Sequence, residues 1–105
     1  MLTINTTVAP WDKKEMRWAL SYAINRQQIV DVVNEGAGAI SPFIFPDYAG
    51  MKPFQDAIKD IVAPIGEFNQ DKSRQLLEAQ GYTLDSGSGK YVGADGKPLS
   101  LDVVL

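Results

Sequence analysis

The sequence predicts an α+β fold: a strand at the N-terminal end, helical segments in the middle and a β-hairpin at the C-terminal end. Three observations support this class. Residues 2–8 alternate apolar and polar side chains, residues 13–34 and 69–80 repeat apolar residues at helical spacing, and an Asp-Gly pair lies between two apolar runs near the C-terminus. The 105 residues fit a single domain and leave no room for two lobes with a cleft between them.

The first predicted element is a strand from Leu2 to Val8, because polar and apolar residues alternate there and β-branched residues are frequent. Pro10 ends this strand. Asp12, with Glu15 three positions later, is typical of a capping box that opens a helix. The helix has one apolar stripe that predicts its buried face, formed by Met16, Ala19, Leu20, Ala23 and Ile24.

A second helix follows directly, from about Arg26 to Asn34, because the apolar stripe changes phase at Asn25. Asn25 is a good N-cap residue, and Gln28 stands at its third helical position. Gly36 is predicted to stop this helix in a left-handed conformation.

The middle of the chain predicts an extended segment and then a short helix. Residues 40–46 contain two prolines and three large apolar residues, so we expect an extended segment packed against another surface. Residues 47–53 read as turns. Residues 55–62 predict one or two helical turns that end before Pro64, with four apolar residues pointing inward: Ala57, Ile58, Ile61 and Val62.

The C-terminal part predicts an amphipathic helix and a hairpin. The helix covers residues 69–80, points Leu76, Leu77 and Ala79 inward, and ends at Gly81 in a left-handed conformation. Residues 85–89 are expected to form a surface loop. The hairpin joins residues 90–92 to a strand over residues 99–105 through a turn at residues 94–97, because Asp-Gly favours tight reversals.

Composition and charge exclude several classes of function. The formal net charge is −3, which does not suit a surface that neutralises nucleic-acid phosphates or anionic lipids. The sequence has no Cys and no His, which removes thiolate nucleophiles, imidazole bases and the usual transition-metal ligands. We therefore predict no enzyme, no metal site, no cofactor and no nucleic-acid partner.

Several weaker signals have simpler structural interpretations. The Gly36 to Gly38 pair follows a helix, whereas a phosphate-binding loop precedes one. Asp56 and Asp60 are typical of a solvated helix face. Trp11 and Trp18 could stack on a sugar or a peptide, or they could pack in the core or between lobes. A hydrolase would need a Ser-Lys or carboxylate pair, and a standalone protein-interaction module would bury its terminal strands; neither has a signature in the sequence.

The chain is predicted to open in one strand and to stop inside another whose last residues are apolar. We expect such a chain to be an excerpt of a larger protein, because an abrupt apolar strand leaves backbone groups unpaired. Exposed strand edges also predict self-association, as dimers or swapped strands.

Three sequence blocks carry a family resemblance. Residues 5–12 read Asn-Thr-Thr-Val-Ala-Pro-Trp-Asp, residues 17–30 read Arg-Trp-Ala-Leu-Ser-Tyr-Ala-Ile-Asn-Arg-Gln-Gln-Ile-Val, and residues 68–82 end in Leu-Leu-Glu-Ala-Gln-Gly-Tyr. Together with the Gly-Ala-Gly of residues 36–38 and the Asp-Gly-Lys of residues 95–97, this order resembles the peptide-type (family 5) substrate-binding proteins of bacterial ABC importers. The departures are Asn25 and Asn69 for Asp and Ser73 for Ala, exchanges that preserve the local capping or helix face.

The resemblance implies a periplasmic-binding-protein-like fold of class II, with residues 1–105 as a single partial domain from the C-terminal lobe of a two-lobe protein. It implies a periplasmic or extracellular, membrane-associated receptor that captures a peptide and delivers it to an ABC permease. Relatives that bind oligosaccharides or nickel complexes are the alternatives. Because hinged closure needs both lobes, we expect the chain alone to bind solute weakly or not at all.

The resemblance also nominates ligand-binding residues by position. In relatives, the strand before the Pro-aromatic-Asp turn and the end of the second helix lie near the ligand, which points to Thr3, Asn5 and Asn34, with the apolar Phe43 added. Thr3 and Asn34 match no motif residue, so the resemblance there concerns place rather than chemistry. Arg17 and Arg26 belong to the motif, and we expect structural contacts from them.

Overall fold

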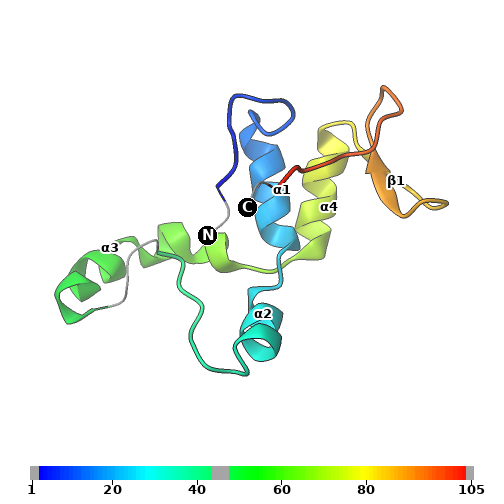
Figure 1. The fold of residues 1–105 in the computed structure, drawn as a ribbon. Coiled ribbons are helices and arrows are strands. Elements are labelled where there is room, and N and C mark those ends of the chain that lie inside the picture. Colours follow the sequence, from blue (N-terminus) through cyan, green and yellow to red (C-terminus); the bar gives the residue numbers. More distant parts are fainter. Residues whose placement is uncertain (1–2, 44–47, 104–105) are drawn as a thin grey trace. The chain divides into compact units, whose positions relative to one another are not determined.

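The computed structural model describes residues 3–43 and 48–103. The elements in this part of the chain are mostly helical (Figure 1): α1 (Lys14–Ala23), α2 (Arg26–Val33), the 3₁₀ helix η1 (Ala49–Met51), α3 (Lys52–Val62), the 3₁₀ helix η2 (Ala63–Gly66), α4 (Gln70–Ala79), β1 (Thr83–Asp85) and β2 (Lys90–Val92). This is a small α+β chain, as predicted. It divides into two compact units, Met1–Ala19 with Asp71–Leu105 and Leu20–Gln70.

The core of the first unit lies between α1 and α4, which run side by side in Figure 1. Met16 on α1 is completely buried, and Ala19 is 1% exposed. Across from them, the Ser73 hydroxyl on α4 donates a 2.7 Å hydrogen bond to the Ala19 carbonyl. Leu77 is also buried, as predicted, but Ala79 is exposed, which corrects the predicted inward face of this helix. The small residues allow the two helices to approach closely.

The end of α4 confirms the predicted glycine stop. Gly81 has φ +86°, its N–H donates to the Glu78 carbonyl, and the Tyr82 N–H donates to the Leu77 carbonyl. This pair of bonds is a Schellman motif, in which a left-handed residue pairs the last helix carbonyls. The motif turns the chain directly into β1.

The two strands form an antiparallel hairpin in which Thr83 pairs with Val92 and Asp85 with Lys90. The sequence predicted only a surface loop at residues 85–89 and missed β1. Asp85 organises the turn, because its carboxylate accepts from the backbone N–H groups of Gly87 and Ser88 and from the Ser88 hydroxyl. The hydrogen bonds from Ser88 and Gly87 lower the pKa of the Asp85 carboxyl below its ordinary 3.8.

A second reversal follows at Asp95–Gly96, as predicted. Gly96 has φ +76°, and the Gly93 N–H donates to the Lys97 carbonyl. Only the start of the returning chain pairs with β2, through a bridge from Val92 to Pro98 and a 2.7 Å bond from the Leu99 N–H to the Tyr91 carbonyl. The predicted strand over residues 99–105 is therefore wrong for residues 100–103, which leave β2 without a ladder, and residues 104–105 lie outside the described part.

The predicted N-terminal strand is also wrong, over residues 3–8, and Leu2 lies outside the described residues. The reason is local. The Asn5 side-chain oxygen accepts from the Thr7 N–H at 3.0 Å and from the Thr7 hydroxyl at 2.7 Å. This turn competes with strand formation, since a short polar side chain offers the backbone an alternative partner.

Helices α1 and α2 agree better with the prediction from the sequence. α1 begins at Lys14, so Asp12 lies just outside the cap position, while Glu15 is in the first turn as predicted. Asn25 caps α2, since its side chain accepts from the Gln28 N–H at 3.0 Å. The left-handed stop begins one residue earlier than predicted, at Glu35 with φ +50°, and continues at Gly36 with φ +77°.

The middle segment differs most from the prediction. Residues 40–46 were predicted as an extended segment packed against another surface. In the described part of it, Ile40 is 39% exposed whereas Phe43 is half-buried, and residues 44–46 lie outside the description. Helix α3 starts at Lys52, earlier than predicted. Its predicted inward face is wrong, because Ala57 is exposed and Ile58 and Ile61 are 42% and 74% exposed. Only Val62 of the four predicted residues is half-buried.

The second unit is held together by backbone contacts around the end of α1. The Ser21 hydroxyl donates to the Ile65 carbonyl at 3.1 Å, and the Asn69 N–H donates to the Tyr22 carbonyl at 2.9 Å. The Arg26 guanidinium donates to the Ser21 carbonyl, which is the structural role predicted for this residue.

A membrane-spanning helix would need a long apolar run, and none of the helices in the described ranges has one.

Candidate solute-binding site

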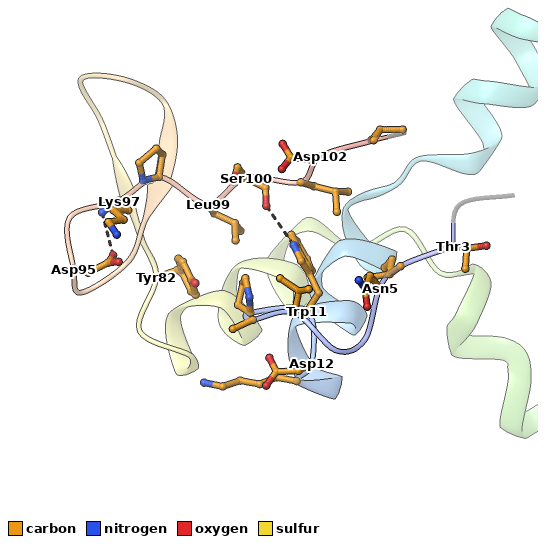
Figure 2. Close-up of a pocket in the computed structure, with 18 residues that line it drawn as sticks. Thr3, Asn5, Trp11, Asp12, Tyr82, Asp95, Lys97, Leu99, Ser100 and Asp102 are labelled. Atoms are coloured by element: carbon orange, nitrogen blue, oxygen red, sulfur yellow. Dashed lines mark hydrogen bonds between the residues drawn. The ribbon is translucent and has the colours of Figure 1, made fainter. Parts of the chain in front are cut away.

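The first unit contains a pocket of about 1030 Å³ between two stretches of chain that are far apart in sequence. One wall is the N-terminal segment from Thr3 to Lys13. The other wall is the C-terminal segment from Asp95 to Val103, and Tyr82 adds an aromatic ring from the end of α4 (Figure 2). The pocket volume is in the range that holds a small organic ligand.

Trp11 joins the two walls. Its indole N–H donates to the Ser100 carbonyl at 3.3 Å, as the dashed line in Figure 2 shows, and its ring is 8% exposed. The Arg17 guanidinium holds the turn beneath it by donating to the carbonyls of Trp11 and Asp12, each at 2.8 Å. Trp11 therefore packs as a wall of the pocket, which is the structural reading the sequence left open for it.

Two of the predicted ligand-binding residues line this pocket. Thr3 and Asn5 are both exposed on the N-terminal wall (Figure 2). Because the Asn5 oxygen already accepts two hydrogen bonds from Thr7, the group that Asn5 offers to a ligand is its amide NH₂.

The other two predicted residues lie in the second unit. Asn34 is the C-cap residue of α2 and is exposed. Phe43 is half-buried, and its N–H donates to the Ser41 hydroxyl at 3.2 Å. The structure thus brings Thr3 and Asn5 together in one pocket, and it places Asn34 and Phe43 elsewhere in the chain.

The pocket carries charges of both signs. Five charged residues are among those that line it: Lys13, Lys97, Asp12, Asp95 and Asp102. Asp95 is partly committed to its own turn, since one carboxylate oxygen accepts from the Lys97 N–H at 3.1 Å (Figure 2).

The sequence interpretation missed the C-terminal wall, including Ser100 and Asp102. It assigned these residues to the second strand of a hairpin, because the Asp-Gly pair before them favours a tight reversal. No sequence signal distinguishes a strand from an extended segment that lines a pocket. No group of three residues among His, Cys, Asp and Glu in the described ranges is arranged to hold a metal ion.

A concave surface lined by polar residues and by charged residues of both signs has the general features of a site for a small solute. The comparison with known families agrees: the family described as "Bacterial extracellular solute-binding proteins, family 5 Middle" matches residues 1–103. The chain belongs to this family of bacterial solute-binding proteins.

Characterised relatives carry different ligand names over the same stretch. The chain is 30% identical to the "Nickel-binding periplasmic protein" of Escherichia coli over 98% of its length, which is 18% of that protein. It is 38% identical to "Di/tripeptide-binding protein 1" of Pseudomonas aeruginosa over 76% of its length and 14% of that protein. It is 31% identical to "Heme-binding protein A" of Haemophilus influenzae over 77% of its length and 14% of that protein. The chain therefore spans less than a fifth of the length of these relatives.

Proposed function

We propose that this chain forms part of a receptor that captures a small solute outside the cytoplasmic membrane and delivers it to an ABC permease. The observation that carries the proposal is the family match over residues 1–103. The pocket in the first unit supports it, because a solute needs a concave surface with a few converging polar groups. The receptor is periplasmic or extracellular and acts beside the membrane that holds its permease.

A peptide is the solute we favour. The relative with 38% identity is named for di- and tripeptides. Charged residues of both signs line the pocket, among them Lys13, Lys97, Asp12 and Asp102, and both signs are needed to bind the two oppositely charged ends of a short peptide. A nickel complex or an oligosaccharide is the alternative, since the relative covered over 98% of this chain is named for nickel.

Thr3 and Asn5 are the residues we assign to the solute on the N-terminal wall, with the Asn5 amide as donor to a carbonyl or carboxylate oxygen. Asn34 and Phe43 are assigned as further contacts from the second unit, by their position in the chain.

The 105-residue chain alone should bind its solute weakly. In a two-lobe receptor the closed state contacts the solute from both lobes. The contacts from one lobe supply only a fraction of the binding free energy. The same chain should self-associate through strand edges that have no partner, since unpaired backbone groups seek another chain.

NMR titration tests the pocket even when binding is weak. We expect dialanine to shift the Trp11 indole and Asn5 amide resonances with a millimolar dissociation constant, on the order of 1 mM, and to shift them more than maltotriose or nickel(II) chloride does. Asn5→Ala should reduce the dialanine response, while Thr83→Ala on the hairpin should leave it unchanged. Unmoved Trp11 and Asn5 resonances with all three probes would contradict the site, and tight binding of any probe would contradict the need for further contacts.

A further inference from the structure

Arg17 on α1 is not among the described residues that line the pocket, yet its side chain is bonded to a stretch of chain that does. One guanidinium nitrogen, Nη1, donates to two consecutive carbonyls, those of Trp11 and Asp12, and both distances are 2.8 Å. Both acceptor residues belong to the N-terminal wall (Figure 2). Because hydrogen bonds from a charged donor are stronger than neutral ones, this double contact constrains the wall firmly.

The double contact selects a bent backbone at the two acceptor residues. In an extended strand, consecutive carbonyls point to opposite sides, so one nitrogen cannot reach both. Here the chain turns: the Asp12 N–H donates to the Val8 carbonyl at 3.1 Å, and the Lys13 N–H donates to the Pro10 carbonyl at 3.2 Å. Arg17 therefore stabilises this turn against an extended backbone.

The position of Arg17 is set by the core of the first unit. Arg17 is half-buried and directly follows Met16, which is completely buried. On the same helix, Ala19 is 1% exposed, and its carbonyl accepts from the Ser73 hydroxyl of α4 at 2.7 Å. Because a packed core permits little movement of α1, the two hydrogen bonds of Arg17 fix the pocket wall relative to that core.

The side chain of Trp11 gives this contact a consequence for the pocket. Its indole N–H donates to the Ser100 carbonyl on the opposite wall, at 3.3 Å (Figure 2). That distance lies just beyond the usual range for an N–H···O bond, so the bond depends on accurate placement of the ring. A shift of the turn that carries Trp11 would break it.

We propose that Arg17 is a positioning residue for the solute: without touching the solute, its guanidinium holds the N-terminal wall in the shape that binds. This inference rests on the proposed function, because it names a residue on which binding at that site depends. A site that is ordered before the ligand arrives binds more tightly, since less ordering remains to be done on binding. Loss of the guanidinium should therefore weaken binding although no contact with the solute is removed.

Dialanine titration of matched arginine variants tests the inference, with the Asn5 side-chain amide resonance as the readout. Arg17→Gln should raise the dissociation constant about tenfold above the wild-type value. Arg17→Lys keeps the charge but not the planar group, and its value should fall between those two. Arg26→Gln is the control, because Arg26 is also half-buried and donates to a carbonyl, that of Ser21 at 3.0 Å, but in the second unit. It should leave the dissociation constant unchanged.

Two further measurements show whether Arg17 acts through Trp11. In the solute-free protein, the Trp11 indole N–H should exchange with solvent about tenfold faster in Arg17→Gln than in wild type, and at the wild-type rate in Arg26→Gln. Trp11→Phe removes the indole N–H and keeps an aromatic ring. Adding Arg17→Gln to Trp11→Phe should therefore weaken dialanine binding less than adding it to wild type, because the two changes remove the same contact between the walls.

The outcomes separate this inference from the proposed function. A dissociation constant and an indole exchange rate that both stay at the wild-type values in Arg17→Gln overturn the inference and leave the pocket standing. An equal loss of affinity in Arg26→Gln, or strictly additive effects with Trp11→Phe, also overturns it, because the loss then reports general destabilisation. A wild type that does not respond to dialanine overturns the site and the inference together. Circular dichroism checks folding, and Arg17→Lys takes the place of Arg17→Gln in all of these comparisons if the latter does not fold.

Discussion

Met16→Ala is the most informative stability test, because Met16 is the one large side chain in the described structure that is completely buried. Trp11, Ala19 and Leu77 are the other buried apolar residues of the part described. With so small a core, the site can relax only by moving α1 toward α4. We therefore expect a cost near the middle of the usual range for such a truncation, about 3 kcal/mol.

The loss from Met16→Ala should be a large fraction of the chain's free energy of unfolding. A chain of this length is stabilised by roughly 5–15 kcal/mol, so the variant loses between a fifth and more than half of it. In urea the midpoint should fall by about 2 M, given a denaturant slope on the order of 1.5 kcal/mol/M. Tryptophan fluorescence reports this transition specifically, since both tryptophans of the sequence, Trp11 and Trp18, belong to the same unit as Met16.

Two control variants separate the loss of core packing from the general effect of a substitution. Met16→Leu conserves volume and should cost less than about 1.5 kcal/mol. Val32→Ala removes a side chain that is 71% exposed on α2 and should change stability by about 0.5 kcal/mol or less. If Met16→Ala were as mild as Val32→Ala, the packing of α1 on α4 would not be the core of the first unit, and this reasoning would be refuted.

Three further changes test the local structure. Asn25→Ala removes the cap that accepts from the Gln28 N–H and should cost about 1 kcal/mol of stability in urea unfolding. Gly81→Ala should cost about 1–2 kcal/mol by the same measurement, because φ is +86° while no other atom lies within 4 Å of the added methyl group. The Asp85 carboxyl should titrate below 3.8 in an NMR experiment, and its hydrogen bonds from Ser88 should be lost as the pH falls through that lowered pKa.

The sign of the pH effect follows from the direction of the shift. The pKa of Asp85 is lower in the folded chain than its ordinary 3.8, so the ionised carboxylate stabilises the hairpin turn at every pH above that value. Asp85→Asn should remove the pH dependence of the Gly87 and Ser88 amide resonances. A titration at or above 3.8 in the wild type would show that the turn does not hold the carboxylate as the structure describes.

Local signals in the sequence predicted the helix ends well, because each end depends on one or two neighbouring residues. Asn25 caps α2, Gly81 closes α4 and Gly96 reverses the chain, all as predicted. At each of these positions the residue itself causes the local structure. Asn25 supplies a side-chain acceptor for an unpaired N–H, and Gly81 and Gly96 adopt positive φ without a steric cost.

Predictions that depend on distant partners succeeded less often. The alternating pattern of residues 2–8 predicted a strand, and so did the apolar run of residues 99–105 after its Asp-Gly turn. A strand needs a neighbour with which to exchange hydrogen bonds, and neither signal says where that neighbour is. The apolar stripe of α3 failed for the same reason, since Ile58 and Ile61 are apolar but exposed. Periodicity identifies the face of an element that can be buried and does not identify what buries it.

Because sequence patterns do not identify distant partners, only the N-terminal wall of the candidate site was predicted. Thr3 and Asn5 were nominated by position and do line the pocket, whereas Ser100 and Asp102 were assigned to a hairpin strand and form the opposite wall. The two segments that fail to become strands are thus the two that enclose the pocket. Their polar groups stay available because no ladder consumes them.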